Sequence, residues 1–302
     1  MSDFWRGKKV IVTGATGFLG GHLLPLLKDA RTLVMLNGRR GVDLRSRAAT
    51  DAFFAAHRGA DVLFHLAADV GGIGYNREHA ARLLRDNALM GLHVLTAARQ
   101  TCRKLVVVGT TCAYPCLCPI PFREDDVWSG YPEPTNAPYG IAKRLLLAYL
   151  EALGGEWAYA IPTNLYGPGD EFGEGRSHVI PALIRRFDGA AGDVTVWGTG
   201  RATRDFLHAR DAARGLALLA ERGQGAVNLG SGREVSIREL VGLVALATGF
   251  RGGVRWDESK PDGQPRRLLD VTRASDLGWR PEIGLEDGLR ETVAWWREQR
   301  DA

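Results

Sequence analysis

The segment "KKVIVTGATGFLGGHLLPLL", residues 8–27, predicts a strand, a glycine-rich loop and a helix in that order. The apolar run "VIVT" is typical of a buried strand, and glycines follow it at positions 14, 17 and 20. The first glycine permits a tight turn, the second lets the backbone approach a pyrophosphate, and the third lets the helix pack on the strand. The segment therefore predicts a dinucleotide site with helix amides facing the anion, the alternative being a purely structural loop. Pro25 predicts a kink in this helix.

The second predicted strand, "TLVMLNGRR", indicates which dinucleotide would bind. An NAD site usually has an acidic residue here for the ribose hydroxyls, but this chain has Asn37, Gly38, Arg39 and Arg40. Two guanidinium groups suit the 2′-phosphate of NADPH, although the same residues are compatible with a solvated turn. Asp43 is interpreted either as a residue that reaches the adenine edge or as a turn former. We therefore expect NADP(H) as the cofactor.

The alternation of strands and helices continues along the chain and predicts the fold class. Further buried strands are expected in "DVLFHLAA" and "KLVVVGTT", and the amphipathic helix between them is expected to bury Leu84, Ala88 and Leu95. His65, inside the first of these strands, is interpreted as a core histidine rather than a catalyst. We predict an α/β protein with a Rossmann-type doubly wound parallel sheet and a smaller mixed α/β C-terminal substrate domain.

The domain boundaries are expected near the end of the parallel strands. Residues 1–165 would form the cofactor domain, which also receives part of 195–230, and residues 166–302 would form most of a discontinuous substrate domain. In that second part "EVSIRELVGLVALATG" begins with a capping box, Ser236 and Glu239, which predicts a helix there. We expect this part to close over a substrate.

Composition narrows the function classes. The chain has 302 residues, 45% of them hydrophobic, and a net charge of +4 with scattered arginines, which disfavours nucleic acid as a partner. No apolar run approaches the roughly 18 residues of a membrane span, and the first residues lack the apolar core of a signal peptide, so we expect a cytoplasmic protein. Four cysteines do not make a disulfide framework. The spacing of Cys112, Cys116 and Cys118 matches no zinc site, so no metal is expected.

A second helix carries a pair of chemical groups. In "EPTNAPYGIAKRLLLAYLEAL" Thr135 or Asn136 is expected to cap the helix, and Pro138 suits its first turn. Tyr139 and Lys143 are four residues apart, which places them on one face. An ammonium beside a phenol is expected to lower the tyrosine pKa from about 10 toward the range useful in proton transfer. A chance pairing is the alternative.

The glycine loop, Thr110 at the end of "VVVGTT", Tyr139 and Lys143 together resemble the extended short-chain dehydrogenase/reductase superfamily. Longer runs, from about residue 9 to residue 297, resemble the GDP-L-fucose synthase family: "EPTNAPYGIAK", "PTNLYGPGDEF", "SHVIPALIRRF", "VWGTG", "RDFLHARD", "SKPDGQPRRLLDVTR" and "LGW". The resemblance implies an NADPH-dependent homodimeric enzyme that converts GDP-4-keto-6-deoxy-D-mannose to GDP-L-fucose by 3,5-epimerisation and 4-keto reduction. An alternative is a 4-ketoreductase or epimerase/reductase for another nucleotide deoxysugar, in a secondary-metabolite or surface-glycan pathway.

The resemblance also implies roles for individual residues. The family's catalytic serine falls on Thr110, which keeps the hydroxyl, and its tyrosine and lysine fall on Tyr139 and Lys143. Its epimerisation cysteine and histidine fall on Cys112 and His178, although a histidine there is also compatible with capping the helix that follows. Cofactor contacts are implied for Gly14, Ala15, Thr16, Gly17, Phe18, Leu19, Gly20, Asn37, Arg39, Arg40, Asp43, Leu66, Ala67, Val108, Gly109, Thr110, Lys143, Pro162, Asn164, Leu165 and His178. Substrate contacts are implied for Asn164, Arg186, Trp197, Arg204 and Asp262.

The chemistry of a 4-keto sugar suits these residues. The carbonyl acidifies the hydrogens on carbons 3 and 5, so one group can remove a proton and another can return one to the opposite face. Cys112 and His178 suit these two roles because a thiol and an imidazole both titrate near neutral pH. A dehydratase of the same superfamily would carry an acid pair where this chain has Cys112 and Ala113, so dehydration is disfavoured.

Overall fold

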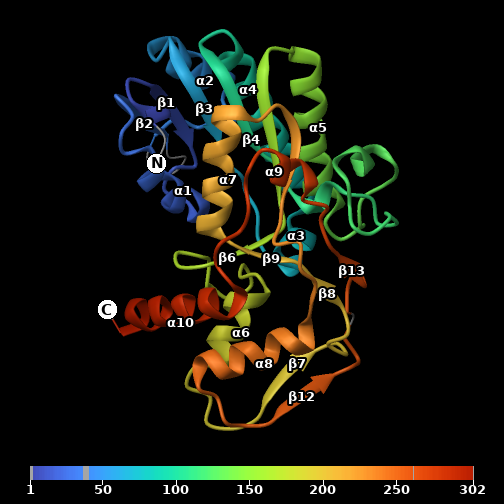
Figure 1. Cartoon of the computed structure of the whole chain (residues 1–302). Coiled ribbons are helices and arrows are strands. Elements are labelled where there is room, and N and C mark those ends of the chain that lie inside the picture. Colours follow the sequence, from blue (N-terminus) through green and yellow to red (C-terminus); the bar gives the residue numbers. More distant parts are fainter. Residues whose placement is uncertain (1–2, 37–40, 261, 302) are drawn as a thin grey trace.

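A computed structural model describes residues 3–36, 41–260 and 262–301, and its largest element is a parallel sheet of six strands (Figure 1). The order across the sheet is β10-β5-β4-β3-β1-β2. The strands are β1 (Lys9–Thr13), β2 (Thr32–Leu36), β3 (Ala60–His65), β4 (Cys102–Val108), β5 (Glu156–Pro162) and β10 (Gly225–Leu229). All neighbours pair in parallel. The predicted doubly wound α/β fold is therefore confirmed.

Helices cover both faces of this sheet, as the buried apolar strands require. One face packs against α1 (Phe18–Leu23), the 3-10 turn η2 (Leu24–Leu27) and α7 (Ala209–Arg222), through a core that includes Leu23 and Leu216. The other face packs against α2 (Arg47–Ala56), α4 (Ala80–Arg99) and α5 (Ala137–Leu153). The predicted break at Pro25 is confirmed, since the α-helix ends at Leu23 and a 3-10 turn follows.

The predicted inner face of α4 needs one correction. Leu95 is buried and Ala88 half-buried, but Leu84 is 37% exposed, and the chain buries Leu83 and the polar Asn87 instead. Asn87 can be buried because its side chain is satisfied: its Nδ2 donates to the carbonyl oxygens of Leu83 and Asp69. Because Asn87 can be buried with these partners, the buried face of α4 differs from the face that the apolar periodicity predicts.

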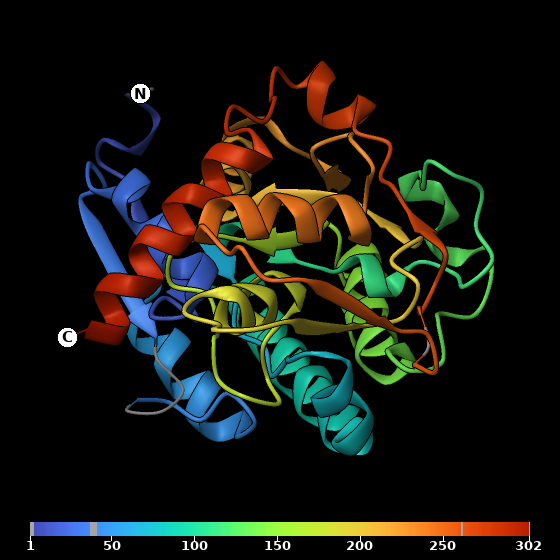
Figure 2. The same ribbon diagram turned by 90° about the horizontal axis from the view of Figure 1, so that it is seen from below.

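The second part of the molecule lies below the sheet in Figure 1 and in front of it in Figure 2. Its helices are α6 (Val179–Phe187), α8 (Ile237–Thr248) and α10 (Leu285–Asp301), and they share a separate core that includes Ile184 and Val244. Its strands are β7 (Val194–Trp197) paired with β12 (Val254–Asp257), and β8 (Thr203–Arg204) paired with β11 (Val235–Ser236) and β13 (Arg266–Arg267).

The chain passes between the two parts more than once. After β5 it runs through β6 (Asn164–Tyr166) into the second part, and it returns to the sheet through β9 (Phe206–His208), α7 and β10. Short elements complete the path: η1 (Asp3–Trp5), α3 (Ile73–Glu78), η3 (Thr111–Ala113), η4 (Glu124–Trp128) and α9 (Thr272–Asp276). Among the helices of the described residues, none combines the length and the apolar character that crossing a bilayer requires.

The sheet topology places the site. The strand order reverses at β1, which has β2 on one side and β3 on the other. In open parallel sheets, ligands bind beyond the carboxyl ends of the strands at such a reversal. The loops that follow β1, β3, β4 and β5 therefore face a common edge, and this is the edge that adjoins the second part of the molecule (Figure 1).

Candidate active site

Helix α5 presents Tyr139 and Lys143 at the edge of the sheet. Its N-terminus has Pro138 in the first turn, as expected, but Asn136 at the N-cap position does not cap with its side chain. The Nζ of Lys143 donates to the carbonyl oxygen of Val108, at 2.8 Å, and lies 5.9 Å from the centre of the Tyr139 ring. The predicted proximity of the phenol and the ammonium is confirmed, and both side chains are buried.

The turn after β4 packs directly on this helix. Thr110 precedes η3, and its Oγ1 accepts a hydrogen bond of 3.1 Å from the amide of Cys112. A Cβ placed on Gly140 would lie 2.1 Å from the carbonyl oxygen of Cys112, so the backbones touch where only glycine fits. Gly140 is the residue after Tyr139. This contact therefore holds the turn that carries Cys112 against the part of α5 that carries the phenol. Cys112 is half-buried with a free thiol.

The pKa of Tyr139 does not move in the predicted direction. Burial raises the pKa of this phenol, and the charges of Cys112 and Asp69 add to the rise. Burial lowers the pKa of Lys143 to about 8. The expected lowering of the tyrosine pKa is therefore wrong for this structure, because desolvation outweighs the ammonium, which points to the Val108 carbonyl. Tyr139 consequently keeps its proton at neutral pH and has it available to donate.

His178 lies at the start of α6, on the side of the second part. It occupies the N-cap position with φ −75° and ψ 177°, but its side chain makes no capping hydrogen bond. The residue is exposed, and partial desolvation by the surrounding chain lowers the pKa of its imidazole. The capping interpretation therefore does not explain a histidine here, and its role stays a prediction.

The glycine loop follows β1 as predicted. Gly14 has φ +70°, and a Cβ on it would lie 2.7 Å from the amide nitrogen of Ala67, so this turn admits only glycine. Gly17 is the N-cap of α1 without any side-chain cap, which leaves the first amides of that helix for a ligand. The loops that hold Gly14 and Leu66–Ala67 are thus in contact at the strand-order reversal. A dinucleotide pyrophosphate fits this arrangement.

Part of the predicted cofactor site lies outside the described residues, namely Asn37, Arg39 and Arg40. Asp43 is described: its carboxylate accepts hydrogen bonds from the Arg45 guanidinium and amide, as a turn former would, and its contact with the adenine edge stays a prediction. Asn164, at the start of β6, donates through its Nδ2 to the carbonyl oxygen of Asp205 at 2.8 Å. Of the other predicted contacts, Val108 and Gly109 lie at the carboxyl end of β4, Pro162 is the last residue of β5, and Leu165 lies in β6.

The predicted substrate residues gather around β7 and β8. The guanidinium of Arg186 lies 5.8 Å from the ring of Trp197, which is 61% exposed, and the Nζ of Lys260 lies at the same distance. Asp262 accepts hydrogen bonds from the amide and the hydroxyl of Thr199, at 2.7 and 2.6 Å. An exposed indole flanked by two cations is a surface on which a nucleobase and a phosphate can bind.

Arg204 connects this surface to the cysteine turn. Burial lowers its pKa to about 10, and the charge of Arg267 adds to the lowering. Asp262, Cys112 and Glu133 act in the opposite direction, so the half-buried guanidinium feels the charges of these three groups. An anionic substrate group would relieve the repulsion between the two arginines.

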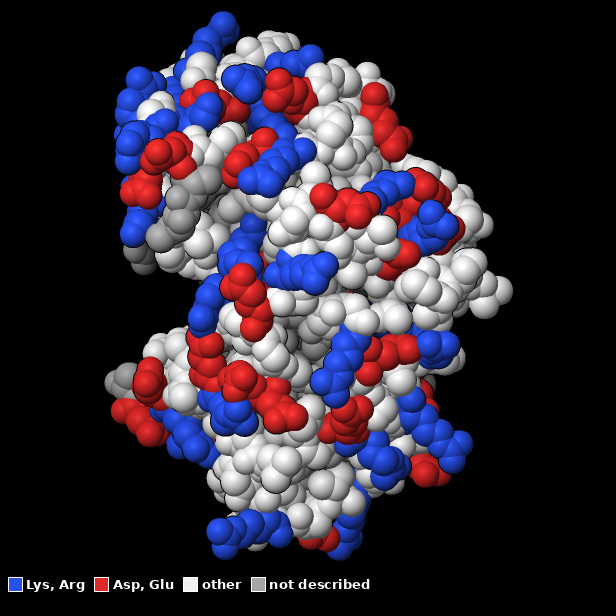
Figure 3. Space-filling view, in the orientation of Figure 1, with Lys and Arg blue, Asp and Glu red and all other residues white. Residues whose placement is uncertain are grey.

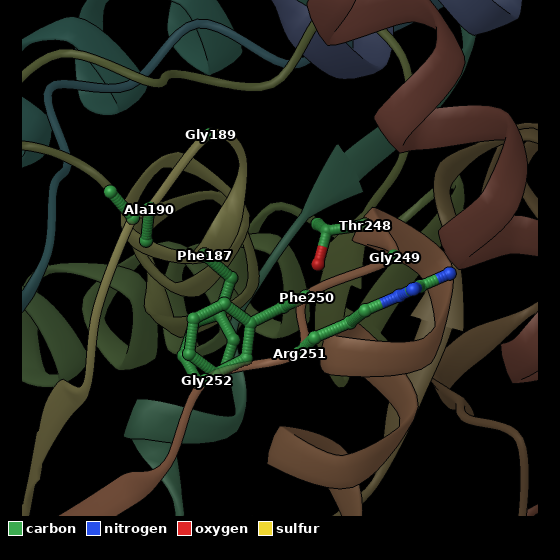
Figure 4. A pocket seen from close by; sticks show the side chains of 9 residues that line it. Phe187, Gly189, Ala190, Thr248, Gly249, Phe250, Arg251 and Gly252 are labelled. Carbon is green, nitrogen blue, oxygen red and sulfur yellow. The ribbon is translucent and has the colours of Figure 1, made fainter.

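Two groups lie outside this arrangement. His65 is a core histidine, as predicted: it is buried, its Nδ1 is 2.8 Å from the Thr13 hydroxyl, and burial lowers its pKa to about 3. A surface cavity of about 480 Å³ lies at the far end of the second part (Figure 4). It is lined by Phe187, Phe250 and Arg251 among others, and Arg251 extends away from the Phe187 ring. No residue expected to contact cofactor or substrate lines this cavity.

The face shown in Figure 3 carries Lys and Arg interspersed with Asp and Glu, and its outline is indented above α10.

Sequence patterns did not single out Asp69, Tyr75 and Arg176, which meet between the loop after β3 and the segment before His178. Neither their spacing nor their composition gives a signal, because Arg176 is far in the chain from Asp69 and Tyr75.

Comparisons with known proteins extend over nearly the whole chain. Residues 10–230 match the model of the NAD dependent epimerase/dehydratase family. Probable GDP-L-fucose synthase 1 of Oryza sativa subsp. japonica is 41% identical, with 97% of this chain and 93% of the relative covered. GDP-L-fucose synthase of Escherichia coli (strain K12) is 38% identical, with 97% and 98% covered. The crystal structure of a GDP-L-fucose synthetase from Naegleria fowleri bound to NADP has a TM-score of 0.88 at 28% identity, with 98% and 94% covered.

Proposed function

This chain belongs to the NAD dependent epimerase/dehydratase family, and we propose that it converts GDP-4-keto-6-deoxy-D-mannose to GDP-L-fucose by 3,5-epimerisation and NADPH-dependent 4-keto reduction. The structural observation that carries the proposal is the contact of Gly140 with the Cys112 carbonyl. It brings the thiol-bearing turn to the phenol, so that a proton-abstracting group and a reducing site serve one sugar. A 4-ketoreductase for another nucleotide deoxysugar is the alternative.

The epimerisation moves one proton off the sugar and one proton back. The Cys112 thiolate takes the proton from carbon 3 or carbon 5, and the electron pair of the broken C–H bond moves into the carbonyl to give an enolate. The His178 imidazolium returns a proton to the opposite face, so the pair ends as a thiol and a neutral imidazole. A protonated imidazole is a stronger acid than a thiol or a phenol, so it gives up the proton readily.

In this proposal two hydroxyl groups, those of Thr110 and Tyr139, stabilise the enolate oxygen. Thr110 already accepts a hydrogen bond from the Cys112 amide, so its own proton is free to be donated. Tyr139 keeps its proton because burial raises its pKa. The same phenol then protonates the oxygen on carbon 4 during reduction, while Lys143 holds the cofactor ribose.

The cofactor is NADP(H), which supplies the hydride for carbon 4 when bound. The turn at Gly14 and the uncapped amides of α1 suit its pyrophosphate, and Arg39 and Arg40 are the residues for its 2′-phosphate. We expect kcat/KM with NADPH to exceed that with NADH by about tenfold or more, from charge-assisted hydrogen bonds of about 1.5–3 kcal/mol. Replacing both arginines by serine should remove most of this preference. Equal kcat/KM for the two cofactors in the unaltered protein would contradict it.

The division of labour between the two parts follows the same proposal. Residues 1–165, joined by the return through β9, α7 and β10, would bind the cofactor, and most of 166–302 would bind the nucleotide sugar. We also propose a homodimer, because Leu84 on α4 and Leu145 on α5 are 37% and 41% exposed on helices that pack against each other. Sedimentation of the purified protein tests the dimer.

The experiment that tests the function is product analysis by NMR. The protein and NADPH are incubated separately with GDP-4-keto-6-deoxy-D-mannose and with its thymidine diphosphate counterpart. The proposal expects GDP-L-fucose from the first substrate and much slower turnover of the second. A product reduced at carbon 4 but unchanged at carbons 3 and 5 would assign the protein to the alternative, a 4-ketoreductase.

A further inference from the structure

We propose that Asp69 and Arg176 are positioning residues for His178, and that they control how much of the sugar is epimerised before it is reduced. The inference rests on the proposed function, since it concerns the proton transfer assigned to His178. Neither residue is expected to touch the substrate. Their effect would come through the backbone that carries the imidazole.

The loop after β3 touches the segment that precedes His178. The amide of Gly72 donates to the carbonyl oxygen of Arg176 at 2.9 Å. A Cβ on Gly72 would lie 2.5 Å from the carbonyl oxygen of Ser177, so any side chain would push the two segments apart. The backbone immediately before His178 is thus built against this loop.

Side chains fasten the same contact. Asp69 Oδ1 accepts a hydrogen bond of 2.7 Å from the Tyr75 hydroxyl and lies 3.6 Å from the Arg176 guanidinium. That guanidinium also lies 4.4 Å from the centre of the Tyr75 ring. Arg82 approaches from the other side, 3.3 Å from Asp69 Oδ2, and donates to the Tyr75 hydroxyl. The Asp69 side chain is 25% exposed and that of Arg176 40%, so solvent weakens the pair without removing it.

At its other end the loop is tied to the helices of the sheet. Asp69 exchanges two hydrogen bonds of 2.9 Å with the Asn87 side chain on α4, one through its amide and one through its carbonyl. The Gly71 amide donates to the Asn76 side chain, which in turn donates to the Asn136 side chain at 3.0 Å. Asn136 is the residue before α5, the helix that carries Tyr139. The loop therefore bridges the phenol side and the imidazole side of the site.

His178 depends on this bridge because its own segment is weakly held. The amides of Arg176 and Ser177 both donate to the Gly173 carbonyl oxygen, over long distances of 3.4 and 3.2 Å. The imidazole forms no cap on α6. Tyr139 and Cys112, in contrast, are fixed by the close approach of Gly140 to the Cys112 carbonyl. The bridge reaches this side only through Asn76 and Asn136, which the variants below leave in place. Loss of the Arg176 guanidinium should therefore slow protonation by His178 while leaving reduction unchanged. Asp69→Asn also removes a charge that raises the pKa of Tyr139, so reduction is judged on the Arg176 variants.

The test compares the variants Arg176→Ala, Asp69→Asn and Arg176→Lys with Arg251→Ala, which removes a guanidinium from the rim of the distant cavity. Each is given the 4-keto substrate and NADPH, and NMR measures the ratio of epimerised to unepimerised product while absorbance measures NADPH oxidation. We expect Arg176→Ala to lower the ratio about tenfold or more, as small misplacements of a reacting group do, with NADPH oxidation within about twofold of the unaltered protein.

The other variants sharpen the result. Asp69→Asn, which keeps the hydrogen-bond acceptor, should lower the ratio less, Arg176→Lys should restore part of it, and Arg251→Ala should leave it unchanged. The double variant with both Asp69→Asn and Arg176→Ala should give the same product ratio as Arg176→Ala alone, because the two residues act as a pair. An unchanged ratio in Arg176→Ala, or an equal fall of both activities with a lower melting temperature, would overturn the inference. Full epimerisation by His178→Asn would instead overturn the role assigned to His178 in the proposed function.

Discussion

The two sides of the candidate site are held by different kinds of contact. On the side of Tyr139 and Cys112 the contacts are buried: Gly140 touches the Cys112 carbonyl, and the buried Lys143 side chain donates to the Val108 carbonyl oxygen. On the side of His178, a backbone hydrogen bond from Gly72 to Arg176 joins the loop to the segment before α6, and the partly exposed Asp69–Arg176 ion pair reinforces it. We therefore expect that single substitutions of exposed side chains can shift His178 and so alter epimerisation. The position of Tyr139, which reduction needs, is held by buried contacts and should not change.

The largest effect is expected from Tyr139→Phe. This change removes the proton that reduction delivers to the oxygen on carbon 4, and general acid catalysis contributes about 10²–10⁴-fold, so NADPH oxidation should fall by at least about 100-fold. Cofactor affinity, measured by calorimetry, should stay near that of the unaltered protein because Lys143 remains. Turnover at a tenth of the original rate or better would remove Tyr139 from this role.

Gly140→Ala tests the backbone contact on the same side. The added Cβ, 2.1 Å from the Cys112 carbonyl oxygen, forces the cysteine turn away from α5. Both epimerisation and reduction should fall by up to about 100-fold, the effect of a misplacement of about 1 Å. Loss of only one of the two activities would contradict the claim that both depend on this contact.

Gly242→Ala is the matched control for that variant. Gly242 lies inside α8, and a Cβ there would meet nothing within 4 Å. Activity should be unchanged, and the free energy of unfolding should rise by about 0.5–1 kcal/mol, because alanine loses less conformational entropy in a helix. A loss of activity in this variant would show that helical Gly-to-Ala changes disturb the protein in general.

A smaller effect is expected from pH. Burial lowers the pKa of Lys143 to about 8, so the side chain is charged below that pH and neutral above it. The pKa of Tyr139 is raised, so the phenol does not titrate in the same range. For reduction, kcat/KM should therefore be level below pH 8 and decline above it, by about tenfold per pH unit at its steepest. A level profile to pH 10 would argue that the Lys143 charge is not needed.

Local patterns in the sequence predicted the parts of this site whose causes are local. The glycine loop and the spacing of Tyr139 and Lys143 depend on a few consecutive residues, and the structure places them as expected. The pKa of Tyr139 was predicted in the wrong direction, because burial depends on the whole fold and spacing along one helix does not report it. Leu84 was misplaced for a related reason, since Asn87 is buried through partners on another loop.

The contacts around His178 show the limit of such prediction most clearly. Asp69 and Arg176 are brought together only by the path of the chain from the sheet to the second part and back. No periodicity, cap or motif encodes a pair of that kind. The resemblance of the sequence to a family therefore predicted a role for His178, but no pattern predicted that Asp69 and Arg176 support the segment before it.

The measurement that tests the account most directly is the reaction of Cys112→Ser in deuterium oxide. A serine hydroxyl is far too weakly acidic to be populated as a base near neutral pH, so deuterium incorporation at carbons 3 and 5 should be lost. Reduction needs Tyr139, Lys143 and NADPH, so the variant should still oxidise NADPH slowly and give an alcohol that is not epimerised. Incorporation at the original rate, with the original product, would contradict the account and leave the thiol as a packing group in a simple ketoreductase.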